Sequence, residues 1–347
     1  MLFNVKQTGG LMAIRVAING FGRIGRLILR IGFKSKNIEF VAVNDITDAK
    51  TLAHLLKYDS VHRAMPETVE ARDKSFLVNG KEIKVLSEKE PSKLPWKDLG
   101  IDLVCEATGK LTSYEKSKAH LDAGTKKVLL TAPAKGDTPV KSIVMGVNES
   151  IYDAKTDHIV SNASCTTNCV VPIAKVLHEN FKIKRGYMTT IHAYTGDQRI
   201  LDAPHKDLRR ARAAAMSMIP TSTGAAKLIG VVFPELKGKI DGVAIRVPTP
   251  DVSLVDLACV VEKETSKEEV NEAFKKACTG PMKNYIQYLT EPLVSTDFTG
   301  NPYSAIFDSA ITSVVDKTLV KLFAWYDNEW GYTCRVIDLI EYMVKKQ

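Results

Sequence analysis

A short run rich in hydroxyl side chains surrounds two cysteines near the middle of the chain. It reads Ala163-Ser164-Cys165-Thr166-Thr167-Asn168-Cys169, and its pattern predicts the end of a strand followed by the start of a helix. A thiolate at a helix N-terminus is stabilised by the helix dipole, and the thiolate is the nucleophilic form of cysteine. We therefore predict that Cys165 is a nucleophile. Cys169, one helical turn later, is better explained as a buried structural cysteine.

His192 lies downstream, in the predicted strand segment Thr189–Thr195. A histidine paired with the thiol would accept its proton and shuttle it during a reaction. Taken alone, a strand histidine is more often a hydrogen-bonded polar residue without a chemical role, so the local pattern leaves both interpretations open. The remaining histidines are expected to have only such a structural role: His54, His62, His120, His158, His178 and His205.

A glycine-rich turn provides a second candidate site. Gly20-Phe21-Gly22-Arg23-Ile24-Gly25 follows the apolar strand Ala13–Asn19 and opens a helix. In this context glycines let the backbone approach a pyrophosphate, and the helix N-terminus offers unpaired N–H groups. Asp45 ends the next strand and would accept the ribose hydroxyls, while repelling a 2′-phosphate. The pattern predicts NAD rather than NADP; the alternative is a turn that serves packing alone.

Alternating strands and helices must position these groups in the first half of the chain. Strands are expected at Ala13–Asn19, Glu39–Asn44, Ile101–Glu106, Lys127–Leu130, Ser142–Val147 and Ile159–Ser161, and helices at Arg26–Phe33 and Thr112–Asp122. Asn79-Gly80 between two apolar runs is typical of a β-hairpin. The alternation predicts an α/β fold, a Rossmann-type doubly wound parallel sheet.

Longer strands and fewer helices characterise the second half. We expect a helix from Cys165 to about Asn180, strands at Ile183–Tyr194, Gly242–Val247, Ser253–Glu262, Ile311–Asp316 and Thr318–Tyr326, and a helix at Lys267–Cys278. Gly331 to Gln347 has helical spacing and closes the chain. This order favours an α+β catalytic domain with a mainly antiparallel sheet. The long polar stretch from Gly196 to Thr223 is expected to be a functional loop or disordered.

Composition and charge exclude several classes. Of 347 residues, 45% are hydrophobic and 25% are charged, which is ordinary for a globular chain and excludes disordered and collagenous classes. No apolar run is long enough for a membrane span, and the N-terminus lacks a secretory signal, so a cytoplasmic location is expected. Six cysteines without Cys-x-x-Cys spacing give no reason to expect a metal site. The net charge of +8 suits anionic ligands such as phosphates or nucleotides, or a nucleic-acid surface.

Taken together, the motifs resemble those of the phosphorylating glyceraldehyde-3-phosphate dehydrogenases, from about Ala13 to the C-terminus. The resemblance rests on the heptapeptide around Cys165 and on eight further motifs in matching order and spacing: Ile18–Arg26, Val43–Asp45, Glu106–Gly109, Ile191–Thr195, Asp207–Ala215, Pro220–Lys227, Arg246–Pro250 and Trp325–Tyr332.

The resemblance implies a reaction: NAD-dependent oxidative phosphorylation of D-glyceraldehyde 3-phosphate to 1,3-bisphosphoglycerate, as in glycolysis and gluconeogenesis. Cys165 would attack the aldehyde to give a thiohemiacetal, and His192 would act as the base. Hydride would then pass to the nicotinamide, and inorganic phosphate would resolve the resulting thioester.

The resemblance also implies the binding residues. Substrate and phosphate would be held by Ser164, Thr166, Thr195, Arg210, Thr223, Gly224 and Arg246. Contacts to NAD would come from Gly20, Gly22, Arg23, Ile24, Gly25, Asp45, Lys89, Thr131 and Asn328. Lys89 stands where an arginine is common, and Ala203-Pro204 lies where the family biases NAD against NADP, so an NAD preference is expected without strict exclusion of NADP.

The architecture implied by the family completes these expectations. An NAD-binding domain would comprise 12–163 with 331–347, and a catalytic domain 164–330, after an N-terminal extension at 1–11 that is expected to be disordered or an artefact. Family members are homotetramers, and the stretch from Gly196 to Thr223 resembles the loop that crosses their subunit interface. No membrane partner is expected.

Two rival functions remain open from the sequence. One is the same fold acting on erythrose 4-phosphate, where water could resolve the thioester. The other is a basic nucleic-acid-binding protein, although no nucleic-acid motif with interleaved aromatic residues is present.

Overall fold

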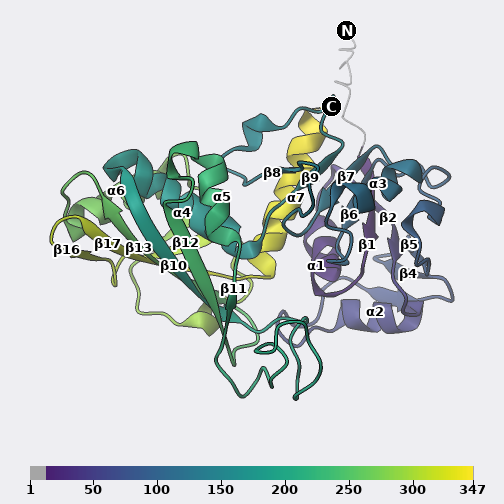
Figure 1. Ribbon diagram of the computed structural model, residues 1–347. Helices are drawn as coiled ribbons and strands as arrows, with labels where there is room; N and C mark the ends of the chain where they lie inside the picture. Colours follow the sequence, from purple (N-terminus) through teal and green to yellow (C-terminus); the bar gives the residue numbers. More distant parts are fainter. Residues whose placement is uncertain (1–12, 347) are drawn as a thin grey trace, which may run out of the picture.

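Two β-sheets, one from each half of the chain, form the frame of the molecule (Figure 1). The computed structural model describes residues 13–346. The α/β sheet and the mostly antiparallel sheet expected from the sequence are both present. The N-terminal extension expected at residues 1–11 lies outside the described residues.

The first sheet has the strand order β3-β4-β5-β2-β1-β6-β7-β9-β8. Its strands are β1 (Ile14–Asn19), β2 (Ile38–Asn44), β3 (Val69–Ala71), β4 (Ser75–Val78), β5 (Lys81–Leu86), β6 (Leu103–Glu106), β7 (Lys127–Leu130), β8 (Lys141–Ser142) and β9 (Ile159–Ser161). All neighbours from β5 to β8 pair in parallel, whereas β4 is antiparallel to β3 and β5. The β4–β5 hairpin turns at Asn79-Gly80, both with positive φ, as predicted.

Helices α1 (Arg23–Gly32), α2 (Ala49–Lys57) and α3 (Tyr114–Asp122) belong to this half, with short 3-10 turns at Pro91–Lys93 and Glu149–Ile151. The parallel strands carry continuous apolar runs because both of their faces are buried. Their carboxyl ends meet at one edge of the sheet, where the glycine turn after β1 and Asp45 after β2 also lie.

The second sheet has the order β11-β12-β10-β13-β17-β15-β14, and β16 pairs with β17. The strands are β10 (Ile183–Ala193), β11 (Ile219–Ser222), β12 (Ile240–Val247), β13 (Ser253–Val261), β14 (Ile286–Leu289), β15 (Ala305–Asp308), β16 (Ser313–Val315) and β17 (Leu319–Tyr326). Its helices are α4 (Cys165–Phe181), α5 (Ala225–Val232) and α6 (Lys267–Thr279), with 3-10 turns at Pro234–Leu236 and Ser295–Phe298. Two pairs, β10–β12 and β14–β15, are parallel.

The last helix, α7 (Trp330–Lys345), returns to the first half and packs on α1. Val336, Leu339, Ile340 and Met343 bury its apolar face in the core of the first sheet. In Figure 1 this yellow helix stands between the two halves. Cys165 packs against the core clusters of both halves, so the predicted nucleophile lies at their junction.

Three expectations about elements need correction. The strand expected at Ser142–Val147 is limited to β8, because Asn148 accepts the N–H of Val144 and Gly146 turns with φ +82°. The stretch from Gly196 to Thr223 is not a loop throughout, since β11 pairs with β12 inside it. Elements α2, α5, β3, β11, β14 and β15 were not anticipated. In the described part of the chain, no helix combines the length and apolarity that a membrane span requires.

Candidate active site

The glycine turn forms a cradle at the end of β1. Gly20 has φ +91°, and a Cβ there would lie 2.7 Å from the backbone nitrogen of Thr108. Around Gly22 a Cβ would meet nothing within 4 Å, so the space above the turn is open. Gly22 caps α1 without a side chain, which leaves the first N–H groups of the helix available to an anion. Ile24 lies in this first turn and packs on the core.

A pocket of about 490 Å³ adjoins this cradle. It is lined by Gly20, Gly22, Asp45 and Lys89, among others. One carboxylate oxygen of Asp45 accepts the N–H of Phe21 at 2.8 Å, which ties the end of β2 to the glycine turn. The open cradle, the uncapped helix and the acidic group beside them fit a dinucleotide.

Two of the residues expected to contact the cofactor have their side chains engaged elsewhere. The guanidinium of Arg23 binds Glu329 and lies 3.2 Å from Asp59. Burial disfavours its charge, but these two carboxylates more than compensate and raise the pKa of Arg23. The hydroxyl of Thr131 donates to the carbonyl of Glu106 at 3.0 Å. Because its side chain is engaged in this way, Arg23 can offer the cofactor its backbone N–H at the start of α1.

Cys165 is the first residue of α4, as predicted. Ser164 is the N-cap, and its hydroxyl accepts the N–H of Thr167 at 3.1 Å. Ala163 turns into the helix with φ +56°, and its carbonyl accepts the hydroxyl of Tyr332 at 3.2 Å. The cap and the Tyr332 contact fix the position of the partly exposed thiol.

His192 lies opposite Cys165, on β10. Its Nε2 is 3.4 Å from the Cys165 sulfur, and its Nδ1 is 2.7 Å from the carbonyl oxygen of Ala193. Because a carbonyl only accepts, Nδ1 carries the proton of the neutral ring. The lone pair of Nε2 consequently faces the thiol, which is the arrangement that a general base requires.

Burial of the pair favours two neutral groups at rest. Burial lowers the pKa of His192 to about 3, and the positive charge of Arg246 adds to the effect. Burial also raises the pKa of the Cys165 thiol, whereas Arg246 and the N–H of Thr166 oppose that rise. The site thus holds a thiol and an unprotonated imidazole in contact.

Hydrogen bonds through Thr195 and Asp197 connect two arginines, Arg246 and Arg210, near the Cys165–His192 pair. Arg246, paired with His192 across β12 and β10, donates to the hydroxyl of Thr195 at 2.8 Å. Thr195 in turn donates to Asp197, which accepts from Arg210 at 2.6 Å. The structure therefore brings Thr195, Arg210 and Arg246 together as one cationic cluster suited to a phosphate.

The other expected phosphate ligands differ in how they present their groups. The hydroxyl of Thr166 bonds to the hydroxyl of Tyr326 at 2.9 Å and is buried. The hydroxyl of Thr223 accepts the N–H of Ala225 at 3.2 Å. Gly224 caps α5 without a side chain, so the helix N-terminus is open to an anion. Helix α5 packs on α4, which starts with the thiol.

Asn328 is linked to His192 through the side chain of Ser253 and the backbone of Ala193. Its amide oxygen accepts the hydroxyl of Ser253 at 2.7 Å, and that hydroxyl accepts the N–H of Ala193 at 3.1 Å. The same peptide segment holds Nδ1 of His192. The sequence assigned no role to Ser253, Tyr326 or Tyr332, although the last two lie within the motif Trp325–Tyr332, because their contacts form only in the folded chain.

Comparison with known proteins finds similarity to one family over most of the chain. Residues 14–114 match the NAD binding domain of glyceraldehyde 3-phosphate dehydrogenase, and residues 164–328 match its C-terminal domain. The glyceraldehyde-3-phosphate dehydrogenase of Geobacillus stearothermophilus is 56% identical over 335 residues, covering 96% of this chain and 99% of the relative. Glyceraldehyde-3-phosphate dehydrogenase 2 of Bacillus subtilis is 52% identical over 335 residues, covering 96% and 98%.

The fold and these matches define an NAD-dependent oxidoreductase. Within that class, the chain belongs to the glyceraldehyde 3-phosphate dehydrogenase family.

Proposed function

We propose that the chain oxidises D-glyceraldehyde 3-phosphate with NAD and phosphorylates the product to 1,3-bisphosphoglycerate. The observation that carries the proposal is the contact of 3.4 Å between the Cys165 sulfur and Nε2 of His192, with Nδ1 held by a carbonyl. This geometry supports proton transfer from the thiol as its sulfur attacks an aldehyde carbon.

The residues then act in sequence. The sulfur of Cys165 bonds to the aldehyde carbon, and Nε2 of His192 takes the thiol proton. Nε2 passes this proton on to the aldehyde oxygen to give a thiohemiacetal, and it takes the hydroxyl proton back when hydride leaves the carbon. NAD, bound at the glycine turn, supplies the hydride acceptor. Cys165 keeps the acyl group as a thioester until phosphate oxygen attacks its carbon and the thiolate leaves.

Two phosphate positions are part of the proposal. Thr195, Arg210 and Arg246 form the cationic cluster described above, and Ser164, Thr166, Thr223 and Gly224 border the two helix N-termini. We propose that these two groups of residues together bind two phosphates, one on the substrate and one that attacks the thioester. Binding a charged substrate in this way fits the net charge of +8.

Assembly and domain division complete the proposal. We propose a homotetramer, supported by exposed apolar side chains in the segment from Gly196 to Thr223. We also propose that 12–163 with 331–347 act as the NAD-binding domain and 164–330 as the catalytic domain. The return of α7 to the core of the first sheet supports this division within the described residues.

The test is the initial rate of NAD reduction with glyceraldehyde 3-phosphate, with and without inorganic phosphate. We expect a strong phosphate requirement, because acyl transfer from the thioester needs that nucleophile. A rate that is indifferent to phosphate would mean that water resolves the thioester. Faster turnover of erythrose 4-phosphate in the same assay would replace the proposed substrate.

A further inference from the structure

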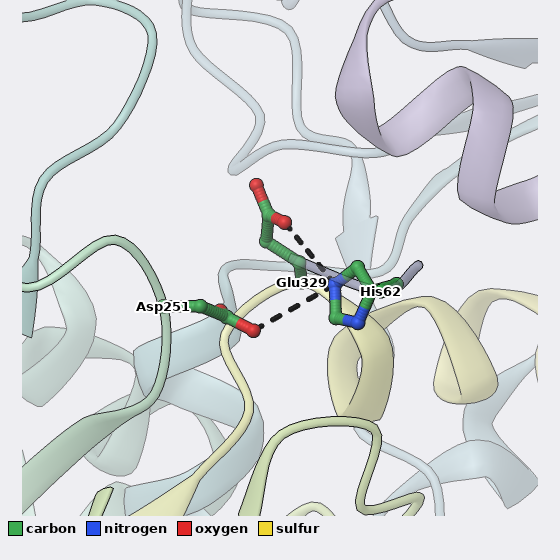
Figure 2. Close-up of side chains that lie close together, drawn as sticks. All are labelled: His62, Asp251 and Glu329. Carbon is green, nitrogen blue, oxygen red and sulfur yellow. Dashed lines mark hydrogen bonds and ion pairs between the residues drawn. The ribbon is translucent and has the colours of Figure 1, made fainter. Parts of the chain in front are cut away.

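Three ionisable side chains far apart in the sequence converge outside the Cys165–His192 site. His62 follows α2, Asp251 lies between β12 and β13, and Glu329 immediately precedes α7 (Figure 2). One ligand atom from each lies within 4.8 Å of the other two. Figure 2 shows Nε2 of His62 directed at both carboxylates, 3.3 Å from Glu329 and 3.6 Å from Asp251.

This cluster is buried and incompletely satisfied. The side chains of His62 and Asp251 are each 2% exposed. Neither carboxylate oxygen of Asp251 has a hydrogen-bond partner among residues 13–346. Burial without a compensating charge favours the neutral form of a carboxyl group, so a cation beside Asp251 would stabilise its charged form.

The surrounding charges do not supply that cation. Arg23 is already shared between Glu329 and Asp59. Asp327, next to Asp251, accepts the N–H groups of Gly300, Glu329 and Trp330. Arg26 also attracts Asp59 and Glu329, whereas Asp251 makes an ion-pair contact only with His62 among residues 13–346. A divalent cation would supply the positive charge that Asp251 lacks, and the ring of His62 offers that cation a nitrogen ligand.

The spacing of the atoms suits such an ion. Two ligands that are each about 2.1 Å from a tetrahedral ion lie about 3.4 Å apart. The observed separations of 3.3 Å and 3.6 Å from Nε2 match that edge. A pocket of about 630 Å³ is lined by His62, Asp251 and Trp330, and it gives an entry path and room for a water ligand. The ring of Trp330, 5.3 Å from that of His62, helps to orient the imidazole.

We propose that His62, Asp251 and Glu329 bind one divalent transition-metal ion, with zinc as the best match. One imidazole with two carboxylates suits zinc, whereas magnesium and calcium prefer oxygen ligands alone. The ion joins the turn after α2 to the two segments that enter β13 and α7. Its role is to stabilise the contact between the two halves of the chain.

Zinc binding to the full-length chain tests the proposal. Because Cys165 and His192 could also bind zinc, the measurements use Cys165→Ser as the parent. After treatment with a chelator, the protein is dialysed against buffered zinc chloride, and bound metal is counted. We expect one zinc per chain and, at a hundredfold excess over Kd, a rise in Tm of about 5 °C.

Matched variants separate this site from other metal binding. Asp251→Asn keeps the shape of the side chain but removes a charged ligand, and Asp308→Asn changes a buried aspartate outside the cluster. We expect Asp251→Asn to weaken zinc binding by more than about 100-fold, since even indirect partners of a metal cost 10- to 100-fold. Asp308→Asn should bind as the parent does.

The outcomes decide the proposal either way. If Asp251→Asn fails to fold, His62→Gln replaces it in the same measurement. The visible spectrum of added Co²⁺ in the parent reports directly whether the bound ion is tetrahedral. Absence of a saturable site, or equal zinc binding by the parent and the cluster variants, would overturn the proposal.

Discussion

At the scale of single residues, Arg246 influences both members of the reactive pair. Its positive charge lowers the pKa of the Cys165 thiol and that of His192. The first effect favours a thiolate, and the second keeps the imidazole free to accept a proton. The same guanidinium also donates to Thr195, which belongs to the phosphate site proposed above.

Arg246→Gln should therefore shift the reactivity of the thiol towards higher pH. Without the guanidinium the thiol pKa rises further, so less thiolate is present at any given pH below it. We expect slower inactivation by iodoacetamide at neutral pH, and a rate profile displaced to alkaline pH. The measurement is the inactivation rate across pH, with Lys227→Gln on exposed α5 surface as the control. An unchanged profile would show that Arg246 does not tune the thiol.

Cys165→Ser should abolish turnover and leave NAD binding intact. A serine hydroxyl is a poor substitute for a thiol, and loss of a covalent nucleophile elsewhere costs orders of magnitude, so we expect a fall of more than about 10³-fold in kcat. Cys169→Ser, which alters the buried cysteine one turn later, is the comparison. Turnover retained by Cys165→Ser would remove this residue from the mechanism.

The positions of Cys165 at the start of a helix and of His192 on a strand were predictable from the sequence, whereas their chemical roles stay predictions. The tautomer of His192 was not predictable, since it depends on a carbonyl of the folded backbone. Nor did the sequence show that the Thr166 hydroxyl points to Tyr326 rather than outward. Both depend on side-chain packing between elements distant in the sequence.

At the scale of elements, the turn between β1 and α1 depends on two glycines for different reasons. Gly25 lies inside α1, where a Cβ would come within 2.1 Å of the carbonyl oxygen of Gly20. Gly22 faces open space and the pocket. Gly25 therefore allows the helix and the strand to pack closely, and Gly22 keeps the space above the turn accessible.

Gly25→Ala should destabilise the fold even though alanine is the better helix former. We expect a loss of about 1–3 kcal/mol in the free energy of unfolding, the usual cost of overpacking. Gly22→Ala should retain stability but weaken NAD binding. Urea unfolding and NAD titration distinguish the two variants, and equal stability of Gly25→Ala and the parent would contradict the packing role.

Asp45, at the end of β2, accepts the N–H of Phe21 in the glycine turn, and we propose that it also binds the ribose hydroxyls of NAD. Asp45→Gly should raise the use of NADP relative to NAD, weakening NAD by about 10- to 100-fold through loss of charge-assisted hydrogen bonds. Asp45→Asn keeps an acceptor for the N–H of Phe21 while removing the charge. Steady-state constants for both cofactors measure the ratio. If neither variant changes it, Asp45 does not read the ribose.

Elements with clear periodicity were predicted within a few residues, including α4, α6, β10 and the β4–β5 hairpin. Shorter ones were missed for physical reasons. Strand β11 has only four residues, Ile-Pro-Thr-Ser, and it adjoins an irregular segment, so its sequence lacks the apolar alternation that would predict its pairing with β12. The parallel pair β14–β15 forms across a long connection, and nothing local specifies it.

At the scale of the molecule, the active site belongs to neither half alone. Cys165 packs against both cores, and α7 carries the chain back to the first sheet. The cluster of His62, Asp251 and Glu329 joins the same two halves a second time. Sequence spacing could not reveal that cluster, because its three members come from separate loops.

Exposed apolar side chains between β10 and α5 bear on assembly. Ile200 is 87% exposed and Leu208 is 80% exposed, and Leu201, Met216 and Met218 are also open to solvent. Their segment forms the loops that project from the lower edge of the molecule in Figure 1. Apolar groups gathered in one exposed segment are typical of an interface with another chain. This supports placing the proposed subunit contact there.

Charges introduced into that segment should break the proposed tetramer. Ile200→Glu combined with Leu208→Glu would bury carboxylates without partners, so we expect smaller assemblies and a lower molar mass by light scattering after size-exclusion chromatography. Val315→Glu, on the exposed edge strand β16, is the control and should leave the mass unchanged. A tetramer that persists in the double variant would place the interface elsewhere, and a monomeric parent chain would refute the tetramer itself.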